Sequence, residues 1–220
     1  MQKLLISGGT GLIGKRFVEL YGDQYEIHIL TREKKTSTNK NIKFHFWNVD
    51  KNELDIEAIN PDYILSLHGA GIADKRWTSK RKQEIIDSRV KPLTLLKDKL
   101  LAYAINPKAI IGVAAIGYYG NRPKETLDES SIPGDGFLSQ SCILWEEAYT
   151  NLASTTQRSV VLRLGTVLSK GGGALPKMLM TKFLRIFNYF DNGQQTMSWI
   201  HIDDVCNIIH TAIENENYKG

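Results

Sequence analysis

A glycine-rich turn near the amino terminus constrains this chain more than any other feature. Residues 3–7 (KLLIS) form an apolar run typical of a buried strand, residues 8–14 read GGTGLIG, and an amphipathic helical pattern begins at Lys15. Strand, glycine turn and helix in direct succession is the context in which such a turn binds a dinucleotide. Glycine permits positive φ and a close approach of pyrophosphate, and the helix amino terminus offers unpaired N–H groups. The predicted contact residues of this turn are Gly8, Thr10, Gly11, Leu12, Ile13 and Gly14.

Length and composition describe an ordinary folded protein. The 220 residues are 42% hydrophobic and 24% charged, and the net charge of +4 is too small to indicate a nucleic-acid partner. Cys142 and Cys206 match no metal or redox spacing, and the longest apolar run, residues 109–119, is too short to span a bilayer. We therefore expect a soluble, cytoplasmic protein with no metal, membrane or nucleic-acid partner. Its oligomeric state stays open.

The turn after the second predicted strand, residues 25–30, indicates which dinucleotide is bound. A NAD site places an acid here, about 20 residues after the glycine turn, to bind the ribose 2′-hydroxyl. This chain has Thr31 and Arg32 at the strand end, with Lys34 and Lys35 behind them. A guanidinium pairs well with a 2′-phosphate, which a carboxylate repels. We expect NADP(H) as the cofactor, and the alternative is a solvated basic turn.

Polar and small residues follow the next two predicted strands, residues 42–47 and 62–67. Asn48 or Asp50 is a candidate for the adenine edge, and His68 is as well explained by packing as by ligand contact. Gly69 lets a ribose lie against the backbone. Strands that alternate with helices predict an α/β fold, a Rossmann-type doubly wound parallel sheet with helices on both faces. Its ligand crevice lies beyond the carboxyl ends of the strands, where all these residues fall.

The second half of the chain continues the alternation. Residues 75–82 form a basic cluster, with Thr78 as a candidate helix cap, and Pro92 is expected to break or restart the helix. Basic residues in a first turn oppose the helix dipole, so the cluster either meets an anion or is a solvated face. Further strands are predicted at 108–115 and 159–164, and further helices at 137–152, from Leu175 and near Asp203.

Taken in order, these motifs resemble the extended short-chain dehydrogenases of the NAD-dependent epimerase/dehydratase superfamily. The resemblance is strongest to an atypical epimerase-like subgroup, some members of which were once labelled cell-division inhibitors. Besides the glycine turn, the matching motifs are LTR at 30–32, RWT at 76–78, SRV at 88–90, GYYG at 117–120, WE at 145–146, LRLG at 162–165, GGGAL at 171–175 and SWIHIDD at 198–204. The resemblance implies NADP and cofactor contacts at Thr31, Arg32, Leu67, His68, Glu84, Arg89 and Val167.

The chain departs from this family in length. Family members usually continue beyond the final Asp-Asp helix, whereas this sequence ends at Gly220. We expect residues 1–165 to form the dinucleotide-binding domain. Residues 166–220 are expected to form a partial substrate-side segment packed on the same domain, which leaves the C-terminal substrate lobe incomplete.

The second departure concerns catalysis. Short-chain dehydrogenases use a serine and a Tyr-x-x-x-Lys pair, in which the lysine lowers the pKa of the tyrosine. No tyrosine here has lysine four positions on, and the serine position falls on Ala114 or Ala115. Tyr118 and Tyr119 are the candidate proton donors because they follow the fifth strand, and they are equally well explained as pocket walls. Glu146, Arg163 and His201 are further candidates.

Two functions remain open at this point. The first is an NADP(H)-dependent, epimerase-like oxidoreductase with non-standard catalytic residues and an unknown small-molecule substrate. The second is a non-catalytic sensor or regulatory module that binds NADP(H). Because function is set by the site and not by the fold, the loss of the serine and the Tyr-Lys pair fits either.

Overall fold

The computed structural model describes residues 1–220 except 58, 123–124, 181–192 and 195. Its main sheet has seven strands in the order β4-β3-β2-β1-β5-β6-β7, and neighbouring strands are parallel except β3 and β4. The strands are β1 (Gln2–Ser7), β2 (Tyr25–Thr31), β3 (Ile42–Asn48), β4 (Glu53–Leu54), β5 (Tyr63–Ser66), β6 (Ala109–Ala115) and β7 (Ser159–Leu164).

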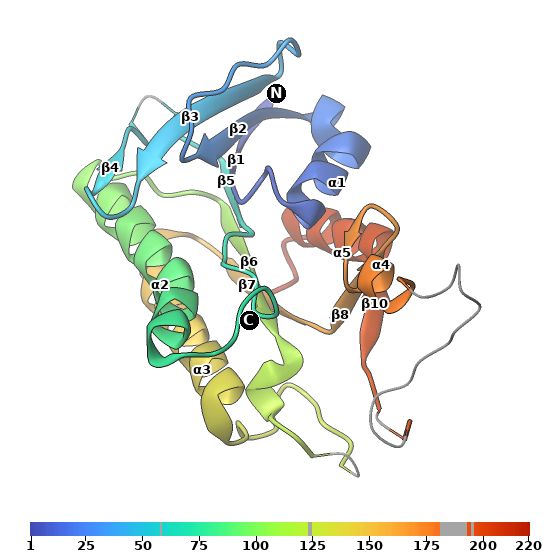
Figure 1. Cartoon of the computed structure of the whole chain (residues 1–220). Helices are drawn as coiled ribbons and strands as arrows, with labels where there is room; N and C mark the ends of the chain where they lie inside the picture. The colour runs from blue at the N-terminus through green and yellow to red at the C-terminus, as the bar shows by residue number, and fades with distance from the viewer. Residues whose placement is uncertain (58, 123–124, 181–192, 195) are drawn as a thin grey trace.

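The strand order reverses at β1. From this strand the chain runs outward through β2 and β3, then crosses back to β5 on the other side and continues through β6 and β7. Such a reversal creates a crevice at the carboxyl ends of the strands. The predicted Rossmann-type doubly wound sheet is therefore confirmed (Figure 1).

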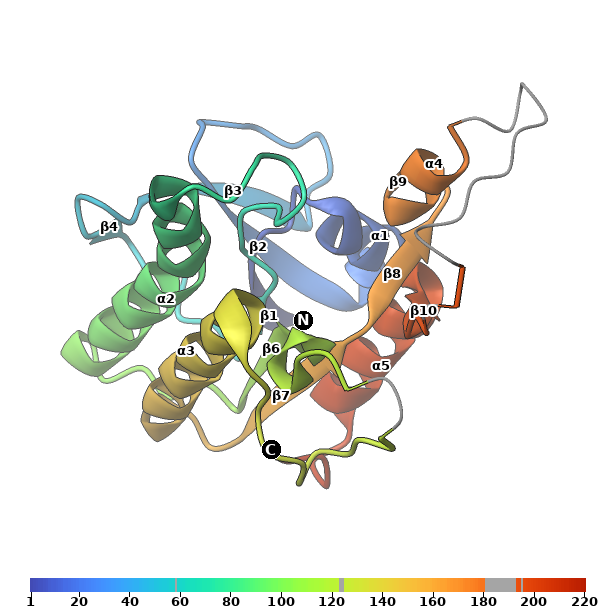
Figure 2. The same cartoon turned by 60° about the horizontal axis from the view of Figure 1, so that its bottom comes forward.

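Helices cover both faces of this sheet (Figures 1 and 2). On one face α1 (Leu12–Tyr21) and α5 (Ile202–Glu214) pack side by side. On the other face lie α2 (Ser79–Ala102) and α3 (Gly136–Leu152). Each helix buries an apolar stripe against the sheet, as Phe17 of α1 and Ile209 of α5 do, and this burial is the main source of stability.

Helix α2 corrects the prediction at Pro92, because it runs unbroken from Ser79 to Ala102 with the proline inside it. Proline removes one backbone hydrogen bond. Leu93, Leu96 and Leu100 are fully buried on the sheet side of the following turns, and this burial outweighs the loss. The helix start was predicted correctly, since the Thr78 hydroxyl accepts a hydrogen bond from the Arg81 N–H at 3.2 Å.

A second sheet was not predicted. It has the order β10-β8-β9 and comprises β8 (Thr166–Ser169), β9 (Gly172–Gly173) and β10 (Trp199–His201). The short helix α4 (Ala174–Met178) begins where a helix was expected from Leu175. The rest of that expected helix lies largely in 181–192, outside the described residues. The boundary predicted at residue 165 stays a prediction, although α5 packs into the same core as α1.

Gly112 on β6 is required by a close contact with α3. A Cβ atom on this residue would lie 2.3 Å from Cε1 of the Tyr149 ring, which is fully buried. We expect Gly112→Ala to lower the free energy of unfolding by about 1–3 kcal/mol through overpacking. Gly22→Ala is the control, because a Cβ there meets Val18 at 3.4 Å and Ile27 at 3.7 Å, both ordinary contact distances. Denaturant unfolding of both variants tests this, and equal stabilities would contradict it.

Candidate functional site

The glycine turn joins β1 to α1 with its backbone exposed to the crevice. Gly8 has φ of 77°, a conformation that side chains disfavour, and its carbonyl accepts a hydrogen bond from Gly11 N–H at 2.9 Å. Gly11 is the N-cap of α1, and no side chain among the described residues caps the helix. The first N–H groups of α1 are thus left for a ligand at the positive end of the helix dipole.

Two of the glycines are required by close packing. A Cβ on Gly8 would lie 2.5 Å from the Leu67 carbonyl oxygen, which follows β5. A Cβ on Gly14 would lie 2.5 Å from the Gly9 Cα atom. The turn therefore sits directly against the end of β5 and folds tightly onto its own helix.

A cavity of about 960 Å³ opens beside this turn, at the carboxyl ends of β1, β2, β3 and β5. It is large enough for a cofactor-sized ligand. The structure brings together many of the predicted contact residues in its lining, namely Gly8, Thr10, Gly11, Thr31, Arg32, Asn48, Leu67, His68, Gly69 and Glu84.

Other predicted residues do not line this cavity. Leu12 lies against Gly172 and Gly173, and the Ile13 carbonyl faces the Cys206 thiol at 4.0 Å. Val167 packs on the core face covered by α1 and α5. Gly14, Arg89, Tyr118 and Tyr119 also lie outside the cavity lining. Cofactor contact at Leu12, Ile13, Gly14, Arg89 and Val167 and the catalytic role of Tyr118 and Tyr119 stay predictions.

The cavity end formed by β2 and β3 carries Arg32 and Lys35 together with the acids Glu33 and Asp50. Arg32 is exposed, and its guanidinium has no hydrogen bond or ion pair within the described part of the chain. The only nearby acid of this turn, Glu33, is turned to Lys35, with 3.6 Å between Oε2 and Nζ. The Asn48 side chain caps its own turn by accepting from Lys51 N–H at 3.2 Å. Arg32 is therefore free to meet an anion.

His68 is held in a buried network under the glycine turn. Its Nε2 lies 3.1 Å from the Arg89 carbonyl oxygen, to which it donates, so Nδ1 accepts from the Ser7 hydroxyl at 2.8 Å. The Ser66 hydroxyl lies 3.2 Å from the same Nδ1 and accepts from the Tyr149 hydroxyl at 3.0 Å. Burial lowers the pKa of His68 to about 4, so the ring is neutral near pH 7.

Arg89 is a structural residue in this arrangement. Its guanidinium is buried, donates to the Ile85 carbonyl at 2.9 Å and the Ala70 carbonyl at 3.2 Å, and lies over the Trp145 ring at 4.8 Å. These contacts support the loop at residues 69–70 from below. The guanidinium therefore acts on the cavity through that loop.

Sequence reasoning missed one wall of the cavity. Helix α2 contributes Arg81, Asp87, Ser88 and Lys91 besides Glu84. Arg81, Glu84, Ser88 and Lys91 are spaced as one helical face, which was the available signal. The Arg81 Nε atom is buried and has no hydrogen-bond partner among the described residues. The end of β3 adds Phe46, Trp47 and Val49, and also Asp50, which the sequence offered beside Asn48 for the adenine edge.

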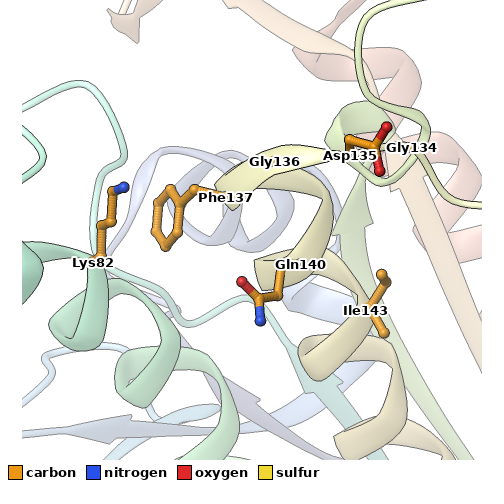
Figure 3. A pocket seen from close by; sticks show the side chains of 7 residues that line it. All are labelled: Lys82, Gly134, Asp135, Gly136, Phe137, Gln140 and Ile143. Carbon is orange, nitrogen blue, oxygen red and sulfur yellow. The ribbon is translucent and has the colours of Figure 1, made fainter.

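A second, shallower cavity of about 430 Å³ lies between the amino ends of α2 and α3 (Figure 3). Lys82 of α2 extends beside the Phe137 ring of α3, with Nζ 5.2 Å from the ring centre. Lys82 belongs to the basic cluster at residues 75–82. Its ammonium group makes a cation–π contact with the Phe137 ring.

Neither a metal centre nor a membrane span is evident in the described residues. They contain no cluster of three or more His, Cys, Asp or Glu side chains suited to a metal ion. None of the described helices is long and apolar enough to cross a bilayer.

Fold and site together define a Rossmann-type α/β protein with a glycine-turn cleft at its strand ends. The NAD dependent epimerase/dehydratase family matches residues 4–220. An epimerase family protein of Staphylococcus saprophyticus is 34% identical over all of this chain and 74% of its own length. One from Mycobacterium bovis is 32% identical over 98% of this chain and 70% of its own. The chain belongs to the NAD-dependent epimerase/dehydratase family.

Solved structures agree with this assignment. Human epimerase family protein SDR39U1, crystallised with NADPH, superposes with a TM-score of 0.85 at 29% identity and covers all of this chain with 72% of its own. A nucleoside-diphosphate sugar epimerase from Corynebacterium glutamicum gives 0.81 at 29% identity, with 45% of its own chain matched.

The neutral state of His68 makes stability depend on pH. In the unfolded chain a histidine has a pKa of about 6.5, whereas in the folded protein it is about 4. Between these values the unfolded chain binds the extra proton, so this contribution to stability falls as pH decreases from 6.5 toward 4. We expect wild type to lose up to about 1.4 kcal/mol more per pH unit than His68→Gln. Urea unfolding across this range checks it, and parallel curves would contradict it.

Proposed function

We propose that this chain binds NADP(H) in the 960 Å³ cavity and acts as an epimerase/dehydratase-like oxidoreductase on a small-molecule substrate. One observation carries the proposal. The glycine turn, pressed against Leu67, presents the amino end of α1 to a cavity whose far end holds Arg32. Within the described residues this end of α1 has no side-chain cap and Arg32 has no partner. That arrangement suits two phosphate groups at one end and a third at the other.

Each part of the cavity has a role in this proposal. The N–H groups of α1 bind the pyrophosphate, and Arg32, with Lys35 beside it, binds the 2′-phosphate. Glu84, on the α2 wall and paired with Arg81 at 3.1 Å, accepts from a ribose hydroxyl in this proposal. When bound, the cofactor supplies or accepts a hydride at its nicotinamide. Human SDR39U1, 29% identical, was crystallised with NADPH, which supports this choice of cofactor.

The choice between enzyme and binding module rests on the catalytic groups. The serine and the Tyr-x-x-x-Lys pair of short-chain dehydrogenases are absent from the sequence, so a proton must come from another group. Tyr118 and Tyr119 at the end of β6 are the candidates for an enzyme. Without such a donor the protein would be a sensor that binds NADP(H) and reports it to a partner.

Reversing the charge at Arg32 tests the cofactor site. We expect Arg32→Asp to weaken NADPH binding at least about tenfold, since a charge-assisted hydrogen bond contributes about 1.5–3 kcal/mol. NADH binding should change much less because NADH lacks the 2′-phosphate. Lys40→Asp is the control, with the same charge change at an exposed lysine outside the cavity lining. Titration by cofactor fluorescence measures both, and equal effects of the two variants would remove Arg32 from the site.

Turnover separates the two functions. We expect wild-type protein to consume NADPH with at least one member of a panel of aldehydes, ketones and nucleoside-diphosphate sugars, monitored by loss of cofactor absorbance. Tight NADPH binding without turnover of any member would favour the sensor.

A further inference from the structure

The 3₁₀ turn η2 (Ile116–Tyr119) lies at the edge of the sheet where the proposed cofactor binds. Strands β5 and β6 are parallel neighbours, and Ser66, the last residue of β5, pairs with Gly112. Strand β6 continues to Ala115 and leads directly into η2, which carries both candidate tyrosines. Because carboxyl ends of parallel strands share one edge, η2 follows β6 on the same side as the cavity loop after β5 (Figure 2).

Arg163 of β7 contacts both of these tyrosines. Its guanidinium forms a two-pronged ion pair with Glu146 of α3, with both N–O distances 2.8 Å. The same group lies over the Tyr118 ring, 3.7 Å from the ring centre. Its Nη1 donates to the Tyr119 hydroxyl at 2.9 Å. The ion pair is about four-fifths buried, which lessens screening by water.

The backbone of η2 is fixed as firmly as the rings. The Tyr118 carbonyl accepts from Gly134 N–H at 2.9 Å and from the Ser139 hydroxyl at 2.7 Å. A Cβ on Gly134 would lie 2.3 Å from the Tyr119 carbonyl oxygen, so only glycine allows this approach. The turn is therefore held by α3 and by the loop that precedes it.

The two tyrosines differ in what their hydroxyls can do. Tyr119 is 8% exposed, and its hydroxyl oxygen is engaged by Arg163. Tyr118 is only partly buried, and its hydroxyl has no hydrogen-bond partner among the described residues. A rigid ring with a free hydroxyl is the arrangement that a proton donor needs.

We propose that Tyr118 donates the proton to a substrate carbonyl oxygen and that Arg163, held by Glu146, is its positioning residue. This rests on the proposed function as an NADP(H)-dependent oxidoreductase. In the reductive direction a bound reduced cofactor would supply a hydride to the carbonyl carbon and would itself be oxidised. The C=O π electrons move to the oxygen, which takes the Tyr118 proton, and water reprotonates the phenolate. Arg163 thus takes over one role of the lysine in the Tyr-x-x-x-Lys pair, because it fixes the position of the Tyr118 ring.

Kinetics with NADPH and any accepted member of the carbonyl panel test this role. We expect Tyr118→Phe to lower kcat by about 100-fold or more, within the range of general acid catalysis, with the Kd for NADPH unchanged. Arg163→Gln should lower kcat by about tenfold, the scale of one charge-assisted contact. Arg163→Lys should lower it less, because it keeps the charge but loses the planar stacking group.

The matched control is Arg16→Gln on α1. Arg16 also forms a two-pronged ion pair with a carboxylate, that of Asp203, with N–O distances of 2.6 and 3.1 Å, but it contacts neither tyrosine and does not line the cavity. We expect its kcat to equal that of wild type. A purely structural role for Arg163 would instead lower thermal stability and cofactor affinity together and leave kcat of the folded fraction unchanged.

Acetylation by N-acetylimidazole, mapped by mass spectrometry, measures how accessible each tyrosine hydroxyl is and needs no substrate. We expect Tyr118 to react about tenfold faster than Tyr119 in wild type, and Arg163→Gln to reduce that difference by releasing the Tyr119 hydroxyl. Equal reactivity in wild type or full activity of Tyr118→Phe would each overturn the proposal. NADPH binding without any turnover, or failure of wild type to bind NADPH, would overturn the proposed function itself.

Discussion

The contact between Gly8 and the Leu67 carbonyl is the constraint on which the site depends. It leaves no room for a Cβ atom, so the turn after β1 lies directly against the end of β5. Because β1 is also the strand at which the sheet order reverses, this contact places the amino end of α1 at the crevice. Cavity, helix dipole and strand ends therefore coincide at one place, and a dinucleotide is the ligand that suits all three.

The cavity wall and the protein core are one continuous structure. His68 connects β1, through Ser7, with the Arg89 carbonyl of α2, and Ser66 extends the network to Tyr149 of α3. The Leu93 face of α2 is buried against the sheet while its Glu84 face lines the cavity. Forces that stabilise the fold thus also hold the binding surface rigid, which lowers the entropic cost of binding.

Most strands and helices of the main sheet were predictable because their signals are local. The apolar run of residues 109–115 and the Thr78 cap needed no distant partner to be recognised. The break expected at Pro92 was wrong, because α2 continues through this residue. Burial of its leucines against strands that are far away in the sequence stabilises the continuous helix. The pairing of β8 with β10 was missed for the same reason: it joins residues more than thirty positions apart.

For the site, the sequence alone determined the glycine turn. It also showed that Arg32 stands at the strand end where a NAD site has an acid. Both features depend only on the backbone or charge of a short segment. The sequence also determined which strand ends carry the polar residues. Only the tertiary structure decided which of them are accessible: it buries Arg89 and a neutral His68, and adds Arg81 and Lys91 to the wall. It alone joins Arg163 to Glu146 and Tyr118. Such contacts depend on how distant segments pack, and no local pattern encodes that packing.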